Sequence, residues 1–436
     1  MSDEHPIGIW HNHRMSRREF LRYFGIAASA ITVSPFFVGC MGRALNQART
    51  EKVYLVKNGD HVQNVAKVLE LMGGVGSVVG PHDIVVLKCN GQWPNRGYTH
   101  TGCIKAVVDA ILAIPGFDGE VHICDNVQFH RDGGVFGFDA TPANRIDNWP
   151  NHNWDSLAAE YHEAGHPVAT KRWITTTSDI SGPADLTDGW MRTFFDVHGI
   201  PTYMSYPVYE SPLTSGRMVD MKHGVWEDGT YSTARRLRVV FMPTLNYHSA
   251  YAGVTSATKS FFGATEIHGG ESGQFRDHYN VHSSSYDHPG NTVSTNAFRA
   301  GEHTARFMTT QYAPDLFITC AMFTGHRGRW SPAVETRTVI AGTKPTSLDY
   351  VSCKNVIAPH AGNLDPDLEG PVRSQLLGCV AGGIGTIDPT RIELVQYDFL
   401  NPSATRNDVE HAIWGYYRGD LGGAQVREVI GAYLER

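Results

Sequence analysis

The sequence lacks any closely spaced pair of cysteines. Its seven cysteines stand at positions 40, 89, 103, 124, 320, 353 and 379, so no two of them form a CxxC motif. Ferredoxin-type clusters and structural zinc sites need closely spaced thiolate ligands, so both patterns are excluded and an iron–sulfur cofactor is not expected. Most of these cysteines lie in apolar stretches and are expected to be small buried residues. Disulfides stay open as an alternative in an oxidising compartment.

The sequence also lacks a basic stripe, an internal repeat and a low-complexity tract. Its net charge is −7, its 22 histidines are spread along the chain, and positive charge is concentrated only at Arg14–Arg18. We therefore expect no nucleic-acid partner. A hydrophobic content of 41% and a charged content of 19% are typical of a globular protein. The length suits one large α/β domain or two closely packed lobes.

Residues 1–42 are predicted to be a twin-arginine (Tat) signal. The segment Ser16–Leu21 contains the pair Arg17 and Arg18, and a weakly apolar run, Phe24–Val33, follows it. This run is too short for a good membrane-spanning helix, and the paired arginines are typical of Tat export. The alternative is an ordinary amphipathic N-terminal helix. We expect the Tat translocase to carry the folded protein to a periplasmic or other extracytoplasmic location.

Cys40 ends a stretch, Val38–Cys40, that resembles a lipobox. Lipidation of Cys40 would anchor the mature protein to a membrane, whereas Phe37 stands where such boxes usually carry Leu. Lipidation and plain cleavage therefore both stay open. The Tat route often carries proteins that have already acquired a cofactor, which hints at a cofactor here.

An alternation of apolar runs and amphipathic segments in residues 43–130 predicts an α/β fold. The runs Asp83–Lys88 and Glu120–Cys124 have the continuous apolar character of parallel strands that are covered on both faces. A helix, Gly102–Ile114, separates them and ends at Pro115 and Gly116. We expect a doubly wound, mostly parallel sheet, in which ligands bind at the carboxyl ends of the strands.

The rest of the chain is predicted to hold three further parts. Residues 131–234 are rich in Trp, Tyr, Asn, Asp, Gly and Pro, which predicts a long, irregular, loop-rich insertion of short strands and loops with one clear helix, Trp154–Ala164. Residues 235–400 are a second α/β segment, and residues 401–436 a C-terminal helical extension. The second segment is expected to contain strands at Leu237–Met242, Asp315–Met322, Thr336–Ala341 and Arg391–Val395 and helices near Thr255–Phe262, Asn296–Gln311, Ser347–Ile357 and Val372–Val380.

The segment Met242–Gly263 is the richest in candidate catalytic residues. A strand leads into a loop that holds His248, and a stretch of small residues then enters the predicted helix that carries Lys259. His248 could act as an acid or base near neutral pH. Lys259 could hold an anion beside the helix N-terminus or act as a nucleophile. The alternative is a polar loop with a surface lysine.

A second group consists of histidines between Glu266 and Pro289. His278 and His282 have the i, i+4 spacing that would place two imidazoles on one helical face, and His268 lies nearby. These three are the candidate ligands of a divalent metal. The glycines and serines around them favour a loop instead, in which the spacing gives no convergence.

Polar residues at other strand ends complete the predicted site. Lys88 and Asn90 follow one strand, and Asp125, a candidate catalytic carboxylate, follows the next. His326 and Arg327 follow a later strand and could bind an acidic substrate or form a surface turn. Asp349 is interpreted as a helix-capping residue.

At these residues the chain resembles the domain of unknown function 362 family, many of whose members carry Tat leaders. The resemblance covers most of residues 53–397, in the stretches Val85–Asn90, Thr99–His100, Cys103–Leu112, Glu120–Asn126, His248–Gly263, Asp315–Gly328 and Ile340–Asp349. It adds His100 to the candidate substrate-binding residues. The chain departs from the family at Cys89, where Pro is usual, and at Asn246, where Lys is usual. It also lacks the ferredoxin-like module of many members.

A more remote similarity is to the nickel-pincer lactate racemase superfamily, whose two α/β lobes enclose a site. The stretch from His248 to Lys259 is similar to its His-x-x-x-Ala/Gly-Gly motif and helical lysine. The similarity implies an acid/base role for His248, a cofactor or anion anchor at Lys259 and a metal ligand at His278. The spacing from the histidine to the glycine differs by one residue from that of the motif, and Ser256 and Ala257 replace the double glycine.

These observations favour an exported enzyme that acts on a small anionic substrate by acid/base or redox chemistry, assisted by a metal or cofactor. The alternative is a periplasmic protein or lipoprotein that binds a ligand or metal as an accessory factor for a partner. A structural surface protein is a third reading, which the clustered polar residues at strand ends disfavour.

Native mass spectrometry of the mature protein from the exporting host distinguishes these alternatives. We expect loss of the leader, with either a lipid on Cys40 or none, and a bound metal in stoichiometric amount if the protein is a metal-assisted enzyme. Metal-free protein that holds a tightly bound small ligand would favour the accessory-factor alternative.

Overall fold

The computed structural model describes residues 50–91, 96–129, 135–137, 148–173, 179–250, 252–267, 274–286, 292–327, 331–400, 413 and 426–427. The predicted leader with Cys40, the candidate ligand His268 and nearly all of the predicted C-terminal extension lie outside these residues. Contacts divide the chain into Met1–Thr50 and Glu51–Arg436. All elements named below belong to the second unit.

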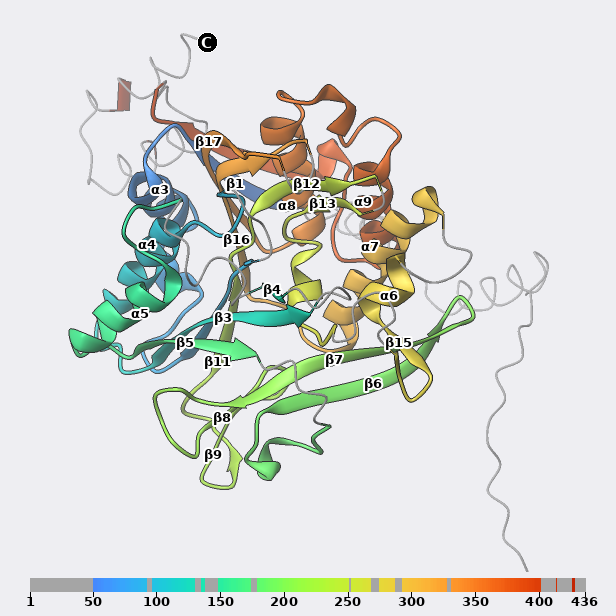
Figure 1. Ribbon diagram of the computed structural model, residues 1–436. Coiled ribbons are helices and arrows are strands. Elements are labelled where there is room, and N and C mark those ends of the chain that lie inside the picture. The colour runs from blue at the N-terminus through green and yellow to red at the C-terminus, as the bar shows by residue number, and fades with distance from the viewer. Residues whose placement is uncertain are drawn as a thin grey trace, which may run out of the picture. The chain divides into compact units, whose positions relative to one another are not determined.

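A large, mostly parallel sheet forms the centre of this unit (Figure 1). Its main strands lie in the order β18, β1, β17, β16, β11, β2, β3 and β5, and among them only β17 runs antiparallel to its neighbours. Their bounds are β1 (Glu51–Lys57), β2 (Ile84–Lys88), β3 (Glu120–Phe129), β5 (Val168–Trp173), β11 (Leu237–Phe241), β16 (Leu316–Gly325), β17 (Val334–Gly342) and β18 (Ile392–Asp398). The predicted α/β fold with a mostly parallel sheet is confirmed. Both predicted α/β segments contribute to this one sheet, with their strands interleaved.

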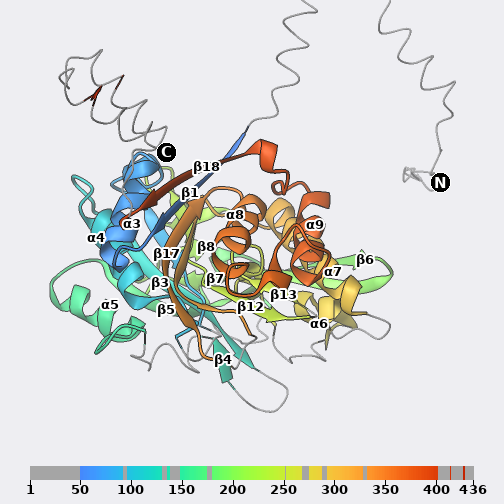
Figure 2. The ribbon, with the colours of Figure 1, turned by 90° about the horizontal axis from the view of Figure 1, so that it is seen from above.

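Helices cover both faces of the sheet, as Figure 2 shows from above. On one face lie α3 (His61–Leu71), α4 (Thr101–Leu112) and α5 (Trp154–Glu163), and on the other lie α7 (Val293–Thr310), α8 (Pro345–Ser352) and α9 (Pro371–Ala381). The all-apolar character of β2 follows from this double cover. Val85 and Leu87 pack in the core with α3 and α4, while Ile84 and Val86 pack in the core of the opposite face.

Capping boxes determine where three of these helices begin. The side chains of Asp60, Asn153 and Thr292 accept hydrogen bonds from the backbone three residues later, at the starts of α3, α5 and α7. Each box satisfies two backbone N–H groups that would otherwise lack a partner in the first turn.

A second, mostly antiparallel sheet, in which only β7 and β15 pair in parallel, occupies much of the region that the sequence predicted to be irregular. Its strands are β6 (Gly189–Val197), β7 (Ile200–Glu210), β8 (Met218–Asp220), β9 (Gly224–Glu227), β10 (Thr230–Tyr231), β14 (Gln274–Phe275) and β15 (His278–Asn280). Strands β6 and β7 have 9 and 11 residues, so this region contains more regular strand structure than the sequence predicted. His198 and Gly199 join them with φ of 55° and 80°, the positive values that a tight two-residue hairpin requires.

The helix predicted at Thr255–Phe262 is absent. This segment instead contains the end of β13 (Gly253–Thr255), which pairs with β12 (Leu245–Ser249), and a single 3₁₀ turn, η3 (Ser260–Gly263). Lys259 directly precedes that turn. The expected helix N-terminus is therefore not present at Lys259.

A buried carboxylate joins the central sheet to the second sheet. Glu120, at the start of β3, is hydrogen-bonded to His122 at 2.9 Å and accepts hydrogen bonds from Ser211 at 2.6 Å and from Thr214 and Arg217. His122 also contacts the Tyr209 hydroxyl at 3.0 Å. Burial alone would raise the pKa of Glu120, but the hydrogen bonds outweigh it and lower the pKa to about 2.

The low pKa of Glu120 predicts an acid-sensitive stability. Because this pKa lies below the usual value of 4.5, the ionised carboxylate stabilises the fold above pH 4.5, and this contribution is lost as the pH falls toward 2. We expect wild type to lose about 3 kcal/mol of unfolding free energy from this group across that window, and Glu120→Gln to lose much less. Urea unfolding at a series of pH values measures this difference.

Glu393→Gln is the matched control, because the Glu393 side chain is 41% exposed beside Lys52. Its pH dependence should follow that of wild type. Equal acid sensitivity in wild type and Glu120→Gln would contradict the assignment.

Candidate functional site

The carboxyl ends of the central parallel strands bring two charged residues together. Lys88 ends β2, and the register of β2 with β3 pairs Lys88 with Cys124, so Asp125 lies one residue further along. On the other side of β2, Lys88 pairs with Phe241 of β11. This convergence of polar residues at the ends of neighbouring strands is the one that the sequence pattern predicted.

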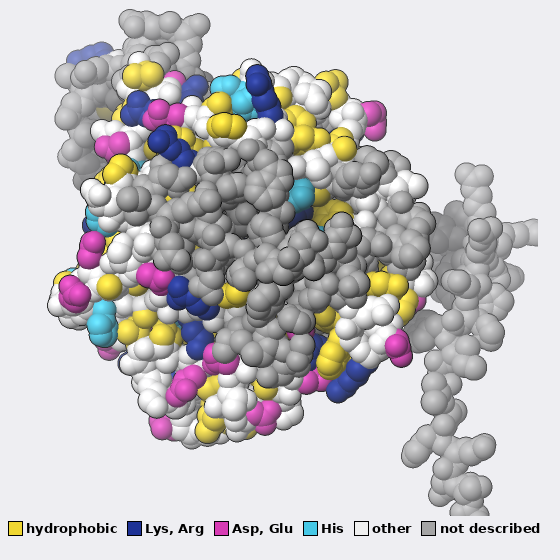
Figure 3. Space-filling view, in the orientation of Figure 1, with side chains coloured by type: hydrophobic (Ala, Val, Ile, Leu, Met, Phe, Trp, Pro, Cys, Tyr) yellow, Lys and Arg dark blue, Asp and Glu magenta, His cyan; other side chains and the backbone are white. Residues whose placement is uncertain are grey.

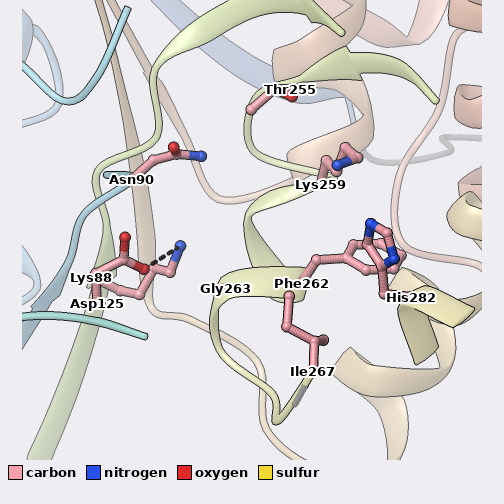
Figure 4. A pocket seen from close by; sticks show the side chains of 9 residues that line it. All are labelled: Lys88, Asn90, Asp125, Thr255, Lys259, Phe262, Gly263, Ile267 and His282. Carbon is pink, nitrogen blue, oxygen red and sulfur yellow. Dashed lines mark ion pairs between the residues drawn. The ribbon is translucent and has the colours of Figure 1, made fainter. Parts of the chain in front are cut away.

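A pocket lies beside these strand ends, and Figure 4 shows the residues that line it. The strand residues Lys88, Asn90 and Asp125 form one side of it, and Lys259, Phe262 and His282 face them. The enclosed free space is about 10 Å³, room for about one water molecule, and the surrounding space is about 340 Å³ when its open mouth is included. The lining residues are Lys88, Asn90, Asp125, Thr255, Lys259, Phe262, Gly263, Ile267 and His282. Four of them, Thr255, Phe262, Gly263 and Ile267, were not singled out from the sequence.

Lys88 and Asp125 form a buried ion pair in this pocket. The Lys88 Nζ lies 3.3 Å from Asp125 Oδ1, and the two side chains are 1% and 3% exposed. Lys88 Nζ also donates a hydrogen bond to Ser260 Oγ at 3.2 Å, and the backbone N–H of Gly91 donates to Asp125 Oδ2 at 2.7 Å. Burial raises the pKa of Asp125, and the neighbouring ammonium of Lys88 partly offsets this.

Gly263 makes room for this ion pair. A Cβ atom at this position would lie 2.6 Å from Lys88 Nζ and 3.0 Å from Asp125 Oδ1, so a side chain here would displace the Lys88 ammonium group. The absent side chain therefore allows the backbone of η3 to pack directly against the ammonium. The sequence did not indicate this role of Gly263, because Gly263 lies far from Lys88 and Asp125 in the chain and only the fold brings them together.

Lys259 reaches the pocket from the opposite wall. It is buried, and its Nζ lies 5.4 Å from the ring centroid of Phe262 and 5.5 Å from that of Tyr286, distances at which the rings stabilise the cation. His282 contacts the same two rings edge-on. Lys259 is thus a second cation in the same pocket as Lys88.

Asp349 fixes the loop that carries Lys259. Its carboxylate accepts hydrogen bonds from the backbone N–H groups of Ala257 at 3.0 Å and Thr258 at 2.8 Å, and from the Thr258 hydroxyl at 2.6 Å. Burial raises the pKa of Asp349 to about 6, while these hydrogen bonds oppose the rise. The interpretation of Asp349 as a capping residue of its own helix was wrong, because it holds a loop from another part of the chain.

His248 does not line the pocket. It lies half-buried in β12, where its Nδ1 is 3.1 Å from the hydroxyl of Ser249. Its neighbour Asn246 is fully buried and makes structural hydrogen bonds, donating to the carbonyl of Gly97 and accepting from the N–H of Gly325, each at 2.7 Å.

His100, His326 and Arg327 are also not among the lining residues. His100 precedes α4, with its ring centroid 5.1 Å from that of His61, and burial lowers its pKa to about 3, so it is neutral at neutral pH. His326 and Arg327 follow β16, and the His326 ring lies 5.7 Å from that of His360.

The candidate metal ligands do not form a helical pair. His278 lies in β15 and His282 in the following helix, α6 (Val281–Tyr286), so they do not share one helical face. His278 is instead hydrogen-bonded to the carbonyl of Arg276 at 2.7 Å. Within the described residues, no three His, Cys, Asp or Glu side chains are grouped so that they could hold a metal ion.

The described surface carries charge of both signs. In Figure 3, the coloured Lys and Arg side chains on the visible face are interspersed with Asp and Glu. Of the helices that the structure describes, none combines the length and apolar character that a membrane span needs.

Comparisons with known protein families, with curated proteins and with solved structures find no match for this chain. The fold and the pocket define its class: an α/β protein with two lysines and an aspartate in a pocket at the carboxyl ends of parallel strands. The two resemblances noted in the sequence stay predictions.

Because the ion pair is buried, we expect removal of one charge to lower the free energy of unfolding more than removal of both charges. Lys88→Met leaves the carboxylate of Asp125 buried without its cation, which we expect to cost about 3–5 kcal/mol of unfolding free energy at neutral pH. Lys88→Met combined with Asp125→Asn removes both charges and should be more stable than Lys88→Met alone. Urea unfolding of the three proteins measures both differences.

Lys52→Met is the control, because the Lys52 side chain is 49% exposed and its pairing with Glu393 should contribute little. A double variant that is no more stable than Lys88→Met would show that the pair is not energetically coupled.

Proposed function

We propose that this protein is an exported enzyme that binds a small anionic substrate at Lys259 and moves protons with Lys88 and Asp125. The observation that carries the proposal is the buried Lys88–Asp125 ion pair in a pocket that holds a second buried lysine. Two lysines and one aspartate line the pocket, so positive side chains outnumber negative ones in the lining, which favours an anionic ligand.

The arrangement supports proton transfer. Burial makes Asp125 a better proton acceptor than an exposed aspartate, because a carboxylate loses more hydration free energy on burial than the neutral acid does. The side-chain amine of Lys88 lies 3.3 Å from the Asp125 carboxylate, where a proton could pass between them. Asn90 and Thr255 supply polar groups that could orient the substrate between the two lysines.

No step of this mechanism uses a metal. His278 and His282 lie on different elements, so they do not form the helical metal-binding pair that their spacing suggested. Export rests on the predicted leader, and His248 could contribute acid/base chemistry only from outside the pocket lining.

The second candidate function is an exported accessory protein that binds its ligand without turnover. The observation that favours it is Asn246, which stands where the resembling family usually has Lys and whose amide group is fully engaged in structural hydrogen bonds.

Binding of small anions tests the proposal. Isothermal titration calorimetry with acetate and with inorganic phosphate should show that Lys259→Gln weakens the binding of the better probe about tenfold, because an ion pair of about 1.4 kcal/mol is lost. Asp125→Asn should strengthen binding or leave it unchanged, since it removes the negative charge from the pocket.

Lys52→Gln should bind like wild type, and thermal unfolding of each variant shows whether it is folded. If neither anion binds to wild type, or if Lys259→Gln binds as well as Lys52→Gln, the anion-site proposal is wrong.

A further inference from the structure

Lys88 has the surroundings of a nucleophilic amine rather than of a structural cation. It is 1% exposed, and beside Asp125 and Ser260 its Nζ approaches the ring of Phe241, at 5.8 Å from the centroid. Lysines become nucleophilic when an apolar pocket or another cation destabilises their charge. Lys88 is buried beside the polar groups of Asp125 and Ser260, and Lys259 is a second lysine that lines the same pocket.

The two lysines have different groups beside their side-chain nitrogen atoms. Lys259 faces two aromatic rings, whose negative faces stabilise an ammonium ion. Lys88 instead has a carboxylate at 3.3 Å that can take its proton, and burial favours the neutral form of that carboxylate. Within a buried ion pair, transfer of the proton leaves two neutral groups and removes the cost of burying two charges.

We propose that Lys88 forms a Schiff base with a small substrate that carries both a carbonyl group and a carboxylate, such as a 2-oxo acid, and that Lys259 binds the carboxylate. This inference rests on the proposed function for the anion site and adds the substrate class and the covalent step. An amine attacks carbonyl carbon, and a carboxylate held by Lys259 would direct that carbon into the space between the two lysines.

Asp125 takes up and returns the one proton that the proposed step needs. The Lys88 ammonium gives a proton to Asp125, and the neutral amine then attacks the carbonyl carbon, forming a C–N bond as the C=O double bond becomes a C–O single bond. After proton transfer from nitrogen to oxygen, the Asp125 carboxyl group protonates the hydroxyl. The C–O bond breaks, water leaves, and the protonated imine remains beside the carboxylate of Asp125.

Borohydride trapping tests the covalent step. Purified full-length protein is incubated with glyoxylate or pyruvate and sodium borohydride, digested, and its peptides are mapped by mass spectrometry. We expect a reduced adduct on the peptide that contains Lys88, at least tenfold more abundant than on the exposed lysines Lys52 and Lys57, which are internal controls in the same sample. Glyoxylate should leave a carboxymethyl group on Lys88.

Three variants and one competitor extend the test. Lys259→Gln keeps Lys88 and should lower the adduct yield at limiting glyoxylate, and acetate, which has a carboxylate but no carbonyl, should protect Lys88. Asp125→Asn should slow trapping, because it removes the proton acceptor. Lys88→Gln should lack the adduct at this position, while the wild-type peptide map stays decisive even if this variant does not fold.

The outcomes separate this inference from the proposed function. If acetate and glyoxylate bind at the Lys259 site but Lys88 is labelled no more than Lys52, the covalent step is overturned and the anion site stands. If neither compound binds and no adduct forms, both proposals are wrong. Selective labelling of Lys259 would also overturn the assignment of Lys88 as the nucleophile.

Discussion

The burial of Lys88 beside Asp125 is the constraint on which the rest of the pocket depends. A lysine that is 1% exposed needs a compensating charge, and the parallel register of β2 and β3 supplies one by placing Asp125 at the same edge of the sheet. The pair also needs a close-packed wall, which Gly263 provides by having no side chain. Register, charge and backbone shape therefore depend on one another at this point of the molecule.

The opposite wall of the pocket is held by buried polar groups. Asp349 accepts from the backbone of Ala257 and Thr258, and Gln375 of α9 accepts from the N–H of Val254 and donates to the Thr258 hydroxyl. These hydrogen bonds fix a loop without regular secondary structure in a buried position, where its N–H groups would otherwise lack partners. The position of Lys259 is thus determined by side chains from two helices that follow it in the sequence.

The predicted and observed structures agree where a local pattern reports on burial. The apolar runs around β2 and β3 predicted a sheet that is covered on both faces, and the strand ends then predicted that Lys88, Asn90 and Asp125 would meet. The prediction for Thr255–Phe262 was wrong because Thr255 belongs to β13, and Asp349 and Gln375, far away in the sequence, hold the following loop. The His278 and His282 spacing implied a shared face only if both lay in one helix, and β15 ends between them.

The sequence by itself determined the α/β class, the mostly parallel sheet and the charged residues at its carboxyl edge, because alternation and apolar runs encode burial locally. Only the tertiary structure decided that Lys259 and His282 face that edge, that His248 and His100 do not, and that 189–210 forms a long hairpin. The physical reason is that these placements depend on hydrogen bonds and packing between segments far apart in the chain. A spacing pattern within one segment contains no information about such partners.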